Sequence, residues 1–273
     1  MITSTQNPKI KQVRQLMADP KARREMRAFV AEGVRLIEDA LRCAWPFNYV
    51  LYSDDLNERG LSLVNNLRSE RIAMEPVSDK LMQAISGTDT SQGILAVMEL
   101  SLLPIPETLD FLLIPDRVRD PGNLGALIRT AEAAGVQAVF IPGETTDPFA
   151  PKVVRSGMGA HFRLPICPMP WERIVIELGS RARSGHPGED ATGKEVFKIC
   201  LADLQGTPFW NVDFKKPVAL IIGGEAEGAS EQAGRLADER ISIPMSGGTE
   251  SLNAATAGAI LMFEVVRQRK PIP

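Results

Sequence analysis

The stretch Ile241-Ser-Ile-Pro-Met-Ser-Gly-Gly-Thr-Glu-Ser-Leu-Asn253 decides the fold of the second half of the chain. Ile241 and Ile243 alternate as in a short strand that stops at Pro244, and a glycine-rich loop follows. Small and apolar residues then recur at helical spacing, namely Leu252, Ala255, Ala259, Met262, Phe263 and Val266. The stretch therefore predicts a strand, a loop and a long helix that starts near Ser251 and Asn253. Helix capping alone is an alternative explanation for both side chains.

A second glycine loop follows the apolar segment Val218 to Ile222. Five consecutive apolar residues favour a strand that is buried on both faces, as in a parallel sheet. Gly223 and Gly224 interrupt this strand, and glycine lets the backbone approach a ligand closely. Glu225 follows at the carboxyl end of the strand, where open α/β sheets carry their chemistry. An ordinary strand-to-helix turn is the alternative, and neither the Rossmann nor the P-loop pattern occurs.

A third segment, Phe111 to Gly135, again predicts a strand, a polar loop and a helix. The residues at helical spacing are Leu124, Leu127, Ile128, Ala131 and Ala134. Gly135 fits a C-terminal stop, and residues 136–141 supply the next strand of a β–α–β unit. Asn123 stands at the predicted helix entry, and Arg129 lies in the second turn. A cap and a solvated charge are the alternative explanations for these two residues.

Taken in this order, the three segments resemble the SpoU (TrmH-like) family of RNA ribose 2′-O-methyltransferases, within the SPOUT class. The matched motifs are residues 123–135, 223–228, and 243–245 with 251–253 and 264–268. The resemblance covers residues 108–273. It implies an α/β domain with a mostly parallel sheet and a deep trefoil knot, an exception to the unknotted rule. It also implies S-adenosylmethionine as methyl donor and an RNA ribose 2′-hydroxyl as acceptor.

The resemblance further suggests which side chains carry the reaction. The family's arginine at the position of Arg129 has been considered a base, but a guanidinium pKa above ~12 makes that role costly. We predict that Arg129 clamps a phosphate and the developing alkoxide, and we leave the proton acceptor open. The other catalytic positions, expected to orient Arg129, the ribose or the cofactor, are Asn123, Glu225, Ser251 and Asn253. The positions expected at the cofactor are Gly223, Gly224, Ile243, Met245 and Leu252. Ala255 departs from the serine usual in the family, which puts one hydrogen bond in doubt.

Residues 1–100 resemble the L30e-like substrate-binding domain that often precedes SpoU catalytic domains. The matched segments are residues 4–11, 29–36 and 91–97. The pattern predicts a basic amphipathic helix, a second helix through Ala40, and strands at Asn48–Tyr52 and Gly93–Val97. Alternating helices and strands favour a small α/β layer structure. The proline-containing residues 101–107 are the predicted linker to the domain at 108–273.

Charge distribution bears on RNA binding more than net charge does. The net charge of −3 argues weakly against a nucleic-acid partner, whereas basic side chains dominate residues 1–30 and could follow phosphates. The predicted RNA contacts are Lys9, Lys11, Arg14 and Arg35. A solvated helix face is the alternative explanation for these charges.

Composition favours a two-domain globular protein, with 273 residues of which 44% are hydrophobic and 24% charged. No apolar run approaches the ~18 residues of a membrane span, and the N-terminus lacks a secretory segment, so a cytoplasmic protein is expected. Three cysteines without metal-ligand spacing and two histidines predict no metal site. The polar residues 168–216 are interpreted as a surface loop or insertion without chemistry.

The sequence leaves three candidate functions open. The favoured one is an active RNA 2′-O-ribose methyltransferase that acts on ribosomal RNA, with tRNA as the alternative substrate. The second is a non-catalytic RNA-binding protein with the same fold, and the third is a small-molecule α/β enzyme that uses another nucleotide. The family places its active site at a homodimer interface, so a homodimer is expected. The small residues of the last helix fit core packing equally well.

Overall fold

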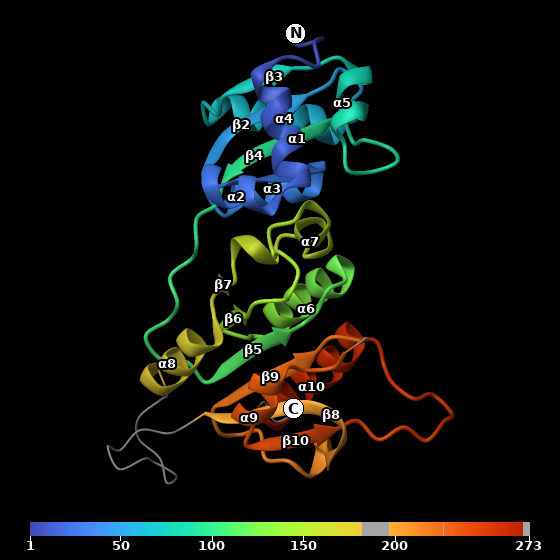
Figure 1. The fold of residues 1–273 in the computed structure, drawn as a ribbon. Coiled ribbons are helices and arrows are strands. Elements are labelled where there is room, and N and C mark those ends of the chain that lie inside the picture. Colours follow the sequence, from blue (N-terminus) through green and yellow to red (C-terminus); the bar gives the residue numbers. More distant parts are fainter. Residues whose placement is uncertain (182–196, 226, 270–273) are drawn as a thin grey trace. The chain divides into compact units, whose positions relative to one another are not determined.

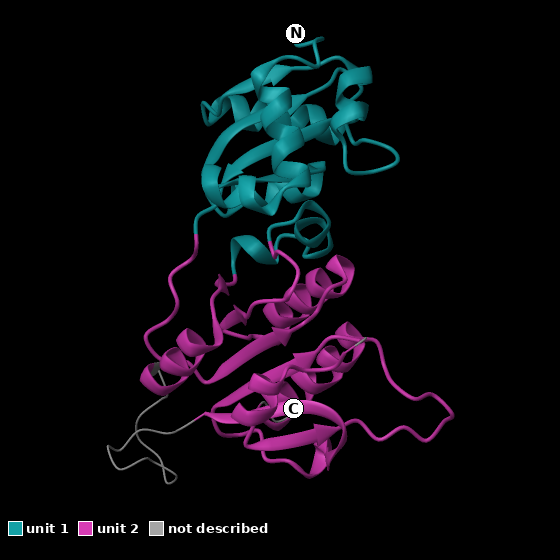
Figure 2. Cartoon of the chain, in the orientation of Figure 1, with its two compact units in different colours: residues 1–101, 149–163 teal, residues 102–148, 164–273 magenta. Residues whose placement is uncertain are grey.

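The structure is a computed structural model that describes residues 1–181, 197–225 and 227–269. The chain forms two compact units (Figures 1 and 2): unit 1 holds residues 1–101 and 149–163, and unit 2 holds residues 102–148 and 164–273. The predicted boundaries of 1–100, 101–107 and 108–273 differ from these units mainly because residues 149–163 pack in unit 1. As functional domains, the predicted boundaries stay a prediction.

Unit 1 is built on a four-stranded sheet in the order β1-β4-β2-β3, in which only β2 and β3 pair in parallel. The strands are β1 (Ala28–Glu32), β2 (Phe47–Tyr52), β3 (Met74–Pro76) and β4 (Ile94–Glu99). The helices are α1 (Pro8–Ala18), α2 (Pro20–Met26), α3 (Val34–Arg42), α4 (Glu58–Ser69) and α5 (Asp79–Ile85). The predicted helices and the strands at β2 and β4 are confirmed, whereas β1, β3, α4 and α5 were not predicted. Fully buried Ile10, Leu51 and Leu95 tie α1 to the sheet.

Residues 149–163 belong to unit 1 through apolar and ionic contacts. They form α7 (Pro151–Ser156) and the short 3-10 helix η1 (Ala160–Phe162). The ring of Phe149 lies 5.3 Å from that of Phe29, and the ring of Phe162 lies 5.3 Å from that of Trp45. These aromatic pairs bury the segment against β1 and the turn after α3.

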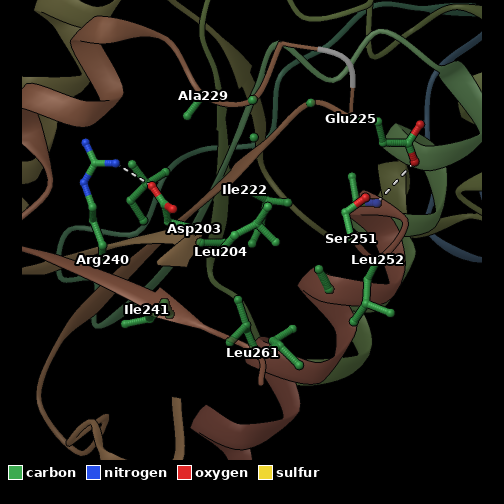
Figure 3. Close-up of a pocket in the computed structure, with 18 of the residues that line it drawn as sticks. Asp203, Leu204, Ile222, Glu225, Ala229, Arg240, Ile241, Ser251, Leu252 and Leu261 are labelled. Carbon is green, nitrogen blue, oxygen red and sulfur yellow. Dashed lines mark hydrogen bonds and ion pairs between the residues drawn. The ribbon is translucent and has the colours of Figure 1, made fainter. Parts of the chain in front are cut away.

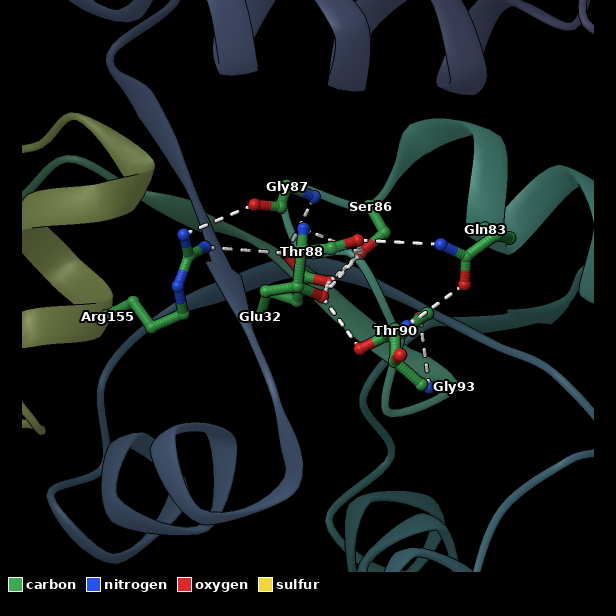
Figure 4. Close-up of polar contacts among 9 residues, drawn as sticks. Glu32, Gln83, Ser86, Gly87, Thr88, Thr90, Gly93 and Arg155 are labelled. Atoms are coloured by element: carbon green, nitrogen blue, oxygen red, sulfur yellow. Dashed lines mark hydrogen bonds and ion pairs between the residues drawn. The ribbon is translucent and has the colours of Figure 1, made fainter.

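A buried carboxylate, Glu32, fastens the loop after α5 to α7 (Figure 4). It accepts hydrogen bonds from the Ser86 hydroxyl, from the Gly87 N–H at 2.9 Å and from the Thr88 hydroxyl at 3.2 Å. Arg155 of α7 approaches Glu32 to 3.7 Å and donates to the Gly87 carbonyl at 3.2 Å. Because a buried charge is costly without such partners, this network holds both the loop and α7 in unit 1.

Unit 2 contains a six-stranded sheet in the order β10-β8-β9-β5-β6-β7, and every pairing in it is parallel. Its strands are β5 (Phe111–Asp116), β6 (Ala138–Ile141), β7 (Ile166–Pro168), β8 (Lys198–Pro208), β9 (Val218–Gly223) and β10 (Glu239–Ser242). Its helices are α6 (Pro121–Ala134), α8 (Trp171–Arg181), η2 (Phe209–Asn211), α9 (Glu231–Leu236) and α10 (Ala254–Arg269). The predicted α/β fold with a parallel sheet is confirmed, and the trefoil knot stays a prediction.

The interpretation of residues 168–216 as a surface loop is wrong for most of the part that the structure describes. Helix α8 follows β7, and β8 lies inside the sheet between β9 and β10. Buried Phe197, Cys200 and Leu201 anchor β8, but the polar residues around them hid this strand in the sequence. Residues 182–196, which hold most of the polar run, lie outside the described residues.

Two predicted helix ends are refined by the structure. Asp120, rather than Asn123, caps α6 by accepting the Asn123 N–H at 2.8 Å. Asn123 therefore lies in the first turn of the helix. Gly135 ends α6 in the left-handed conformation, with φ of 77°, as predicted.

Of the predicted apolar positions within helix α10, only Met262 is buried. The buried residues are Ala254, Gly258, Leu261, Met262, Glu264 and Val265. A Cβ on Gly258 would lie 2.3 Å from Cδ2 of Leu127, so this glycine permits the close packing of α10 on α6. The side chain of Phe263 remains 49% exposed. Among the described residues, no helix is long and apolar enough to cross a membrane.

Candidate active site

One carboxylate joins the end of β9 to the starts of α6 and α10. Oε1 of Glu225 accepts from Nδ2 of Asn123 at 2.7 Å, from Nδ2 of Asn253 at 2.7 Å and from the Ala254 N–H at 3.2 Å. Nδ2 of Asn253 also donates to Oδ1 of Asn123 at 2.9 Å. Three predicted catalytic residues thus form one hydrogen-bonded cluster, although Asn123 and Asn253 are 130 positions apart in the sequence.

Asn253 is at the same time a helix cap. Its Oδ1 accepts the Ala255 N–H at 3.0 Å and the Thr256 N–H at 3.2 Å. The capping alternative is therefore correct for Asn253, but it does not exclude the site, because the amide nitrogen serves the Glu225 cluster. Although Ala255 lacks a hydroxyl, its backbone still takes part in the cap.

A cavity of about 480 Å³ adjoins this cluster (Figure 3), within the ~300–1,000 Å³ typical of small-molecule sites. The predicted site residues on its wall are Gly223, Gly224, Glu225, Ile243, Met245, Ser251 and Leu252. The cavity thus gathers every predicted cofactor position, although their role as ligands stays a prediction. Much of the remaining wall is apolar and includes Leu204, Ile222 and Leu261.

The two glycines after β9 are required by backbone packing. A Cβ on Gly224 would lie 2.1 Å from the carbonyl oxygen of Arg117, and one on Gly223 would lie 2.7 Å from the Ala229 nitrogen. Close approach of a ligand was the predicted reason for these glycines. The structure gives a different one, because neighbouring loops already occupy the space that a side chain would need.

Sequence reasoning missed the polar pair on the cavity wall, Asp203 of β8 and Arg240 of β10. Asp203 accepts from the Arg240 guanidinium and from the Gln205 N–H at 3.0 Å. These two donors, the backbone N–H first, hold the pKa of Asp203 below its usual value. Only recognition of β8 as an inner strand could have brought Asp203 to this wall.

Arg129 stands apart from the Glu225 cluster. It is exposed, does not line the cavity, and among the described residues it makes no hydrogen bond or ion pair. Six helical positions separate it from Asn123, which corresponds to about 9 Å along α6 and about 120° around its axis. Within one chain, Arg129 therefore does not join the other predicted catalytic residues.

The predicted RNA contacts of unit 1 differ in availability. Lys11, Arg14 and Arg35 are exposed on α1 and α3. The neighbouring Arg23 is 3% exposed and donates to the carbonyl of Leu16 at 2.5 Å, so it supports the end of α1 and is not free for phosphate. Basic residues of the N-terminal segment thus divide into structural and accessible ones.

Lys9 is engaged within unit 1. Its ammonium group forms an ion pair with Glu75 and lies 4.8 Å from the centre of the Tyr49 ring. An RNA phosphate would have to compete with both partners.

No group of three or more His, Cys, Asp or Glu side chains among the described residues could hold a metal ion, and the absence of a metal stays a prediction.

Two family profiles match the chain. The MRM3-like substrate-binding domain matches residues 7–96, and the SpoU rRNA methylase family matches residues 110–182 and 189–263. This chain belongs to the SpoU rRNA methylase family. Membership confirms the predicted family and the predicted substrate-binding domain before it. All predicted catalytic residues lie within the SpoU match.

Known SpoU proteins resemble the chain over nearly its whole length. The 23S rRNA (uridine(2479)-2′-O)-methyltransferase of Streptomyces viridochromogenes is 32% identical, over 97% of this chain and 92% of that protein. The 23S rRNA (guanosine(2553)-2′-O)-methyltransferase RlmP of Bacillus subtilis is also 32% identical, over 97% and 98%. The crystal structure of the SpoU methyltransferase AviRb from S. viridochromogenes with AdoMet superimposes with a TM-score of 0.81 at 31% identity, covering 96% of this chain and 99% of that one.

Proposed function

We propose that this chain transfers the methyl group of S-adenosylmethionine to a ribose 2′-hydroxyl of ribosomal RNA. The observation that carries this proposal is the cavity whose wall holds all five predicted cofactor positions beside the Asn123–Glu225–Asn253 cluster. Similarity to named 23S rRNA methyltransferases over 97% of the chain supports the ribosomal substrate and disfavours tRNA. We further propose a cytoplasmic location, since the S. viridochromogenes and B. subtilis relatives are bacterial proteins.

The cavity suits S-adenosylmethionine, which supplies an electrophilic methyl group on a positively charged sulfur. Ile243, Met245 and Leu252 line the cavity and are only partly buried, so bound S-adenosylmethionine would cover apolar surface there. Glu225 brings a carboxylate to the same wall, which favours a cationic ligand over a neutral one.

Within this site, we assign positioning roles to Asn123, Glu225 and Asn253. Because Oε1 of Glu225 already accepts three hydrogen bonds, the carboxylate is better suited to hold the helix starts than to remove a proton. Ser251 lines the cavity, so its hydroxyl is available to a ligand. Fixed loops of this kind hold the acceptor hydroxyl in line with the methyl group, and such orientation accounts for roughly 7–11 kcal/mol in favourable cases.

Arg129 is proposed to act in the cavity of a second copy of the chain. Its exposure and its distance from the Glu225 cluster keep its guanidinium out of the cavity of its own chain. The exposed face of α10, which includes Phe263, offers apolar surface to a partner. There the guanidinium would clamp a phosphate next to the target ribose and stabilise the developing alkoxide.

Unit 1 is proposed to hold the RNA through Lys11, Arg14 and Arg35, while Lys9 contributes less because Glu75 neutralises it. Contacts between such side chains and phosphates release counterions, so RNA affinity should fall steeply with rising salt concentration. The MRM3-like match over residues 7–96 supports a substrate-binding role for this unit.

Replacing Arg129 by Ala tests this function. Methyl transfer to ribosomal RNA should fall about 100-fold or more because transition-state stabilisation is lost, while affinity for S-adenosylmethionine stays within about twofold. Incorporation of labelled methyl groups measures the first quantity, and calorimetry measures the second. Arg235→Ala is the matched control, since Arg235 is an 80% exposed arginine paired with Glu231 on α9. Undiminished transfer by Arg129→Ala would remove this residue from the mechanism.

A further inference from the structure

The cavity has a second polar end, formed by the ion pair between Asp203 and Arg240. Figure 3 shows this pair on the opposite side of the cavity from Glu225 and Ser251. The side chain of Asp203 is 25% exposed and that of Arg240 is 56% exposed, so both remain accessible to a ligand. The proposed methyl transfer uses the Glu225 side and assigns no task to this pair.

Apolar side chains separate the two polar ends. Leu204, Ile222 and Leu261 line the intervening wall, and Leu204 is 64% exposed although it is a large hydrophobic residue. A planar aromatic ring against this wall would bury apolar surface. The charged ammonium and carboxylate of a methionine group would instead lose hydration there. The wall therefore favours the adenine end of the cofactor over its amino-acid end.

The donors and acceptors at the Asp203 end match the edge of an adenine ring. Oδ2 of Asp203 accepts from Arg240 and Oδ1 accepts from the Gln205 N–H, and the Leu204 N–H also acts on this carboxylate. A carboxylate offers about four acceptor positions, so capacity for a further donor remains. The low pKa of Asp203 keeps it ionised at neutral pH, when a carboxylate only accepts. Arg240 only donates. Adenine presents the complement, an amino donor beside ring-nitrogen acceptors.

We propose that Asp203 recognises the adenine ring of the cofactor by accepting a hydrogen bond from its exocyclic amino group, with Arg240 donating to an adjacent ring nitrogen. This assignment rests on the proposed use of S-adenosylmethionine and adds a base-selecting residue to that site. It follows that the cavity discriminates against hypoxanthine, whose 6-oxo group would set one acceptor against another.

The test compares the affinities of two ligands by calorimetry, S-adenosylhomocysteine and its deaminated analogue S-inosylhomocysteine. The wild-type protein should bind the inosyl compound about tenfold or more weakly. Asp203→Asn should bring the two affinities to within about twofold, since an amide can donate to the 6-oxo group. Glu231→Gln removes the same charge on the exposed face of α9, and it should keep the wild-type ratio.

Two results would overturn the proposal: a wild-type protein that binds both ligands equally, or an Asp203→Asn variant that keeps the wild-type ratio. A wild-type protein that binds neither ligand would instead refute the cofactor assignment, and this proposal with it. Circular dichroism checks that the variant folds. If it does not, Asp203→Ser, which retains an acceptor for the Gln205 N–H, takes its place with the same expected loss of discrimination.

Discussion

Asn253 shows how one side chain serves both folding and chemistry. Its oxygen caps α10, while its nitrogen joins Glu225 and Asn123. The sequence motif indicated Asn253 and Glu225 as site residues, and the structure brings them together. The sequence motif could not indicate Asp203 or Arg240. These two residues are close because β8 pairs with β10, and no local sequence pattern reveals that pairing.

At this scale, we predict that Asn253→Ala damages stability and activity together. Loss of the cap should lower the free energy of unfolding by about 1–2 kcal/mol. Loss of the bonds to Glu225 and Asn123 should reduce methyl transfer as well. Denaturant unfolding and transfer assays measure the two effects.

Asn57→Ala is the matched control for this prediction. Asn57 caps α4 in unit 1 by accepting the Gly60 N–H at 2.9 Å. The control should lose similar stability but keep its transfer rate per folded molecule. If both variants transfer methyl groups equally well, the Glu225 cluster has no role in the reaction.

Among the elements, apolar runs such as β9 were predictable, since a strand buried on both faces shows in five consecutive apolar residues. The buried face of α10 was not predictable, because alanines and glycines lie on several sides of this helix and are small enough to be buried on any of them. Packing of Gly258 on Leu127 selects the observed face. β8 was missed because its buried residues are mixed with polar ones.

The turn after β9 provides the element-scale prediction. Gly224→Ala should lower the free energy of unfolding by about 1–3 kcal/mol, because the new Cβ would lie 2.1 Å from the Arg117 carbonyl oxygen, a backbone atom. In the control Gly234→Ala on α9, the nearest atom to the Cβ is a guanidinium nitrogen of Arg240 at 3.5 Å. The control should be neutral or stabilising by about 0.5–1 kcal/mol. Equal stability of the two variants in denaturant would contradict the packing explanation.

For the molecule as a whole, the order of the motifs along the chain did not predict which unit residues 149–163 belong to. Residues 149–163 lie between two elements of unit 2 in sequence but fold into unit 1, through Phe149, Phe162 and Arg155. Family motifs did not reveal this, because the ring contacts and the ion pair of Arg155 with the buried Glu32 join residues that are far apart in the sequence. In the proposed dimer, each active site also combines the cavity of one chain with Arg129 of the other.

Shared active sites predict complementation between two inactive variants. Arg129→Ala keeps the cavity, and Leu252→Asp keeps the arginine but places a charge on the cavity wall. Random mixing by co-expression should restore about one quarter of the wild-type activity, since half of the dimers are mixed and each holds one complete site. Light scattering verifies the dimer. A mixture as inactive as its components would contradict a shared site.

The central claim is methylation of a ribose in ribosomal RNA, and the most direct test is nucleotide-resolution mapping of 2′-O-methyl groups. Ribosomal RNA from a strain without this protein should lack a methyl group that the wild-type strain carries. The wild-type protein should restore that methyl group, and Arg129→Ala should not. Identical methylation maps with and without the protein would contradict the account.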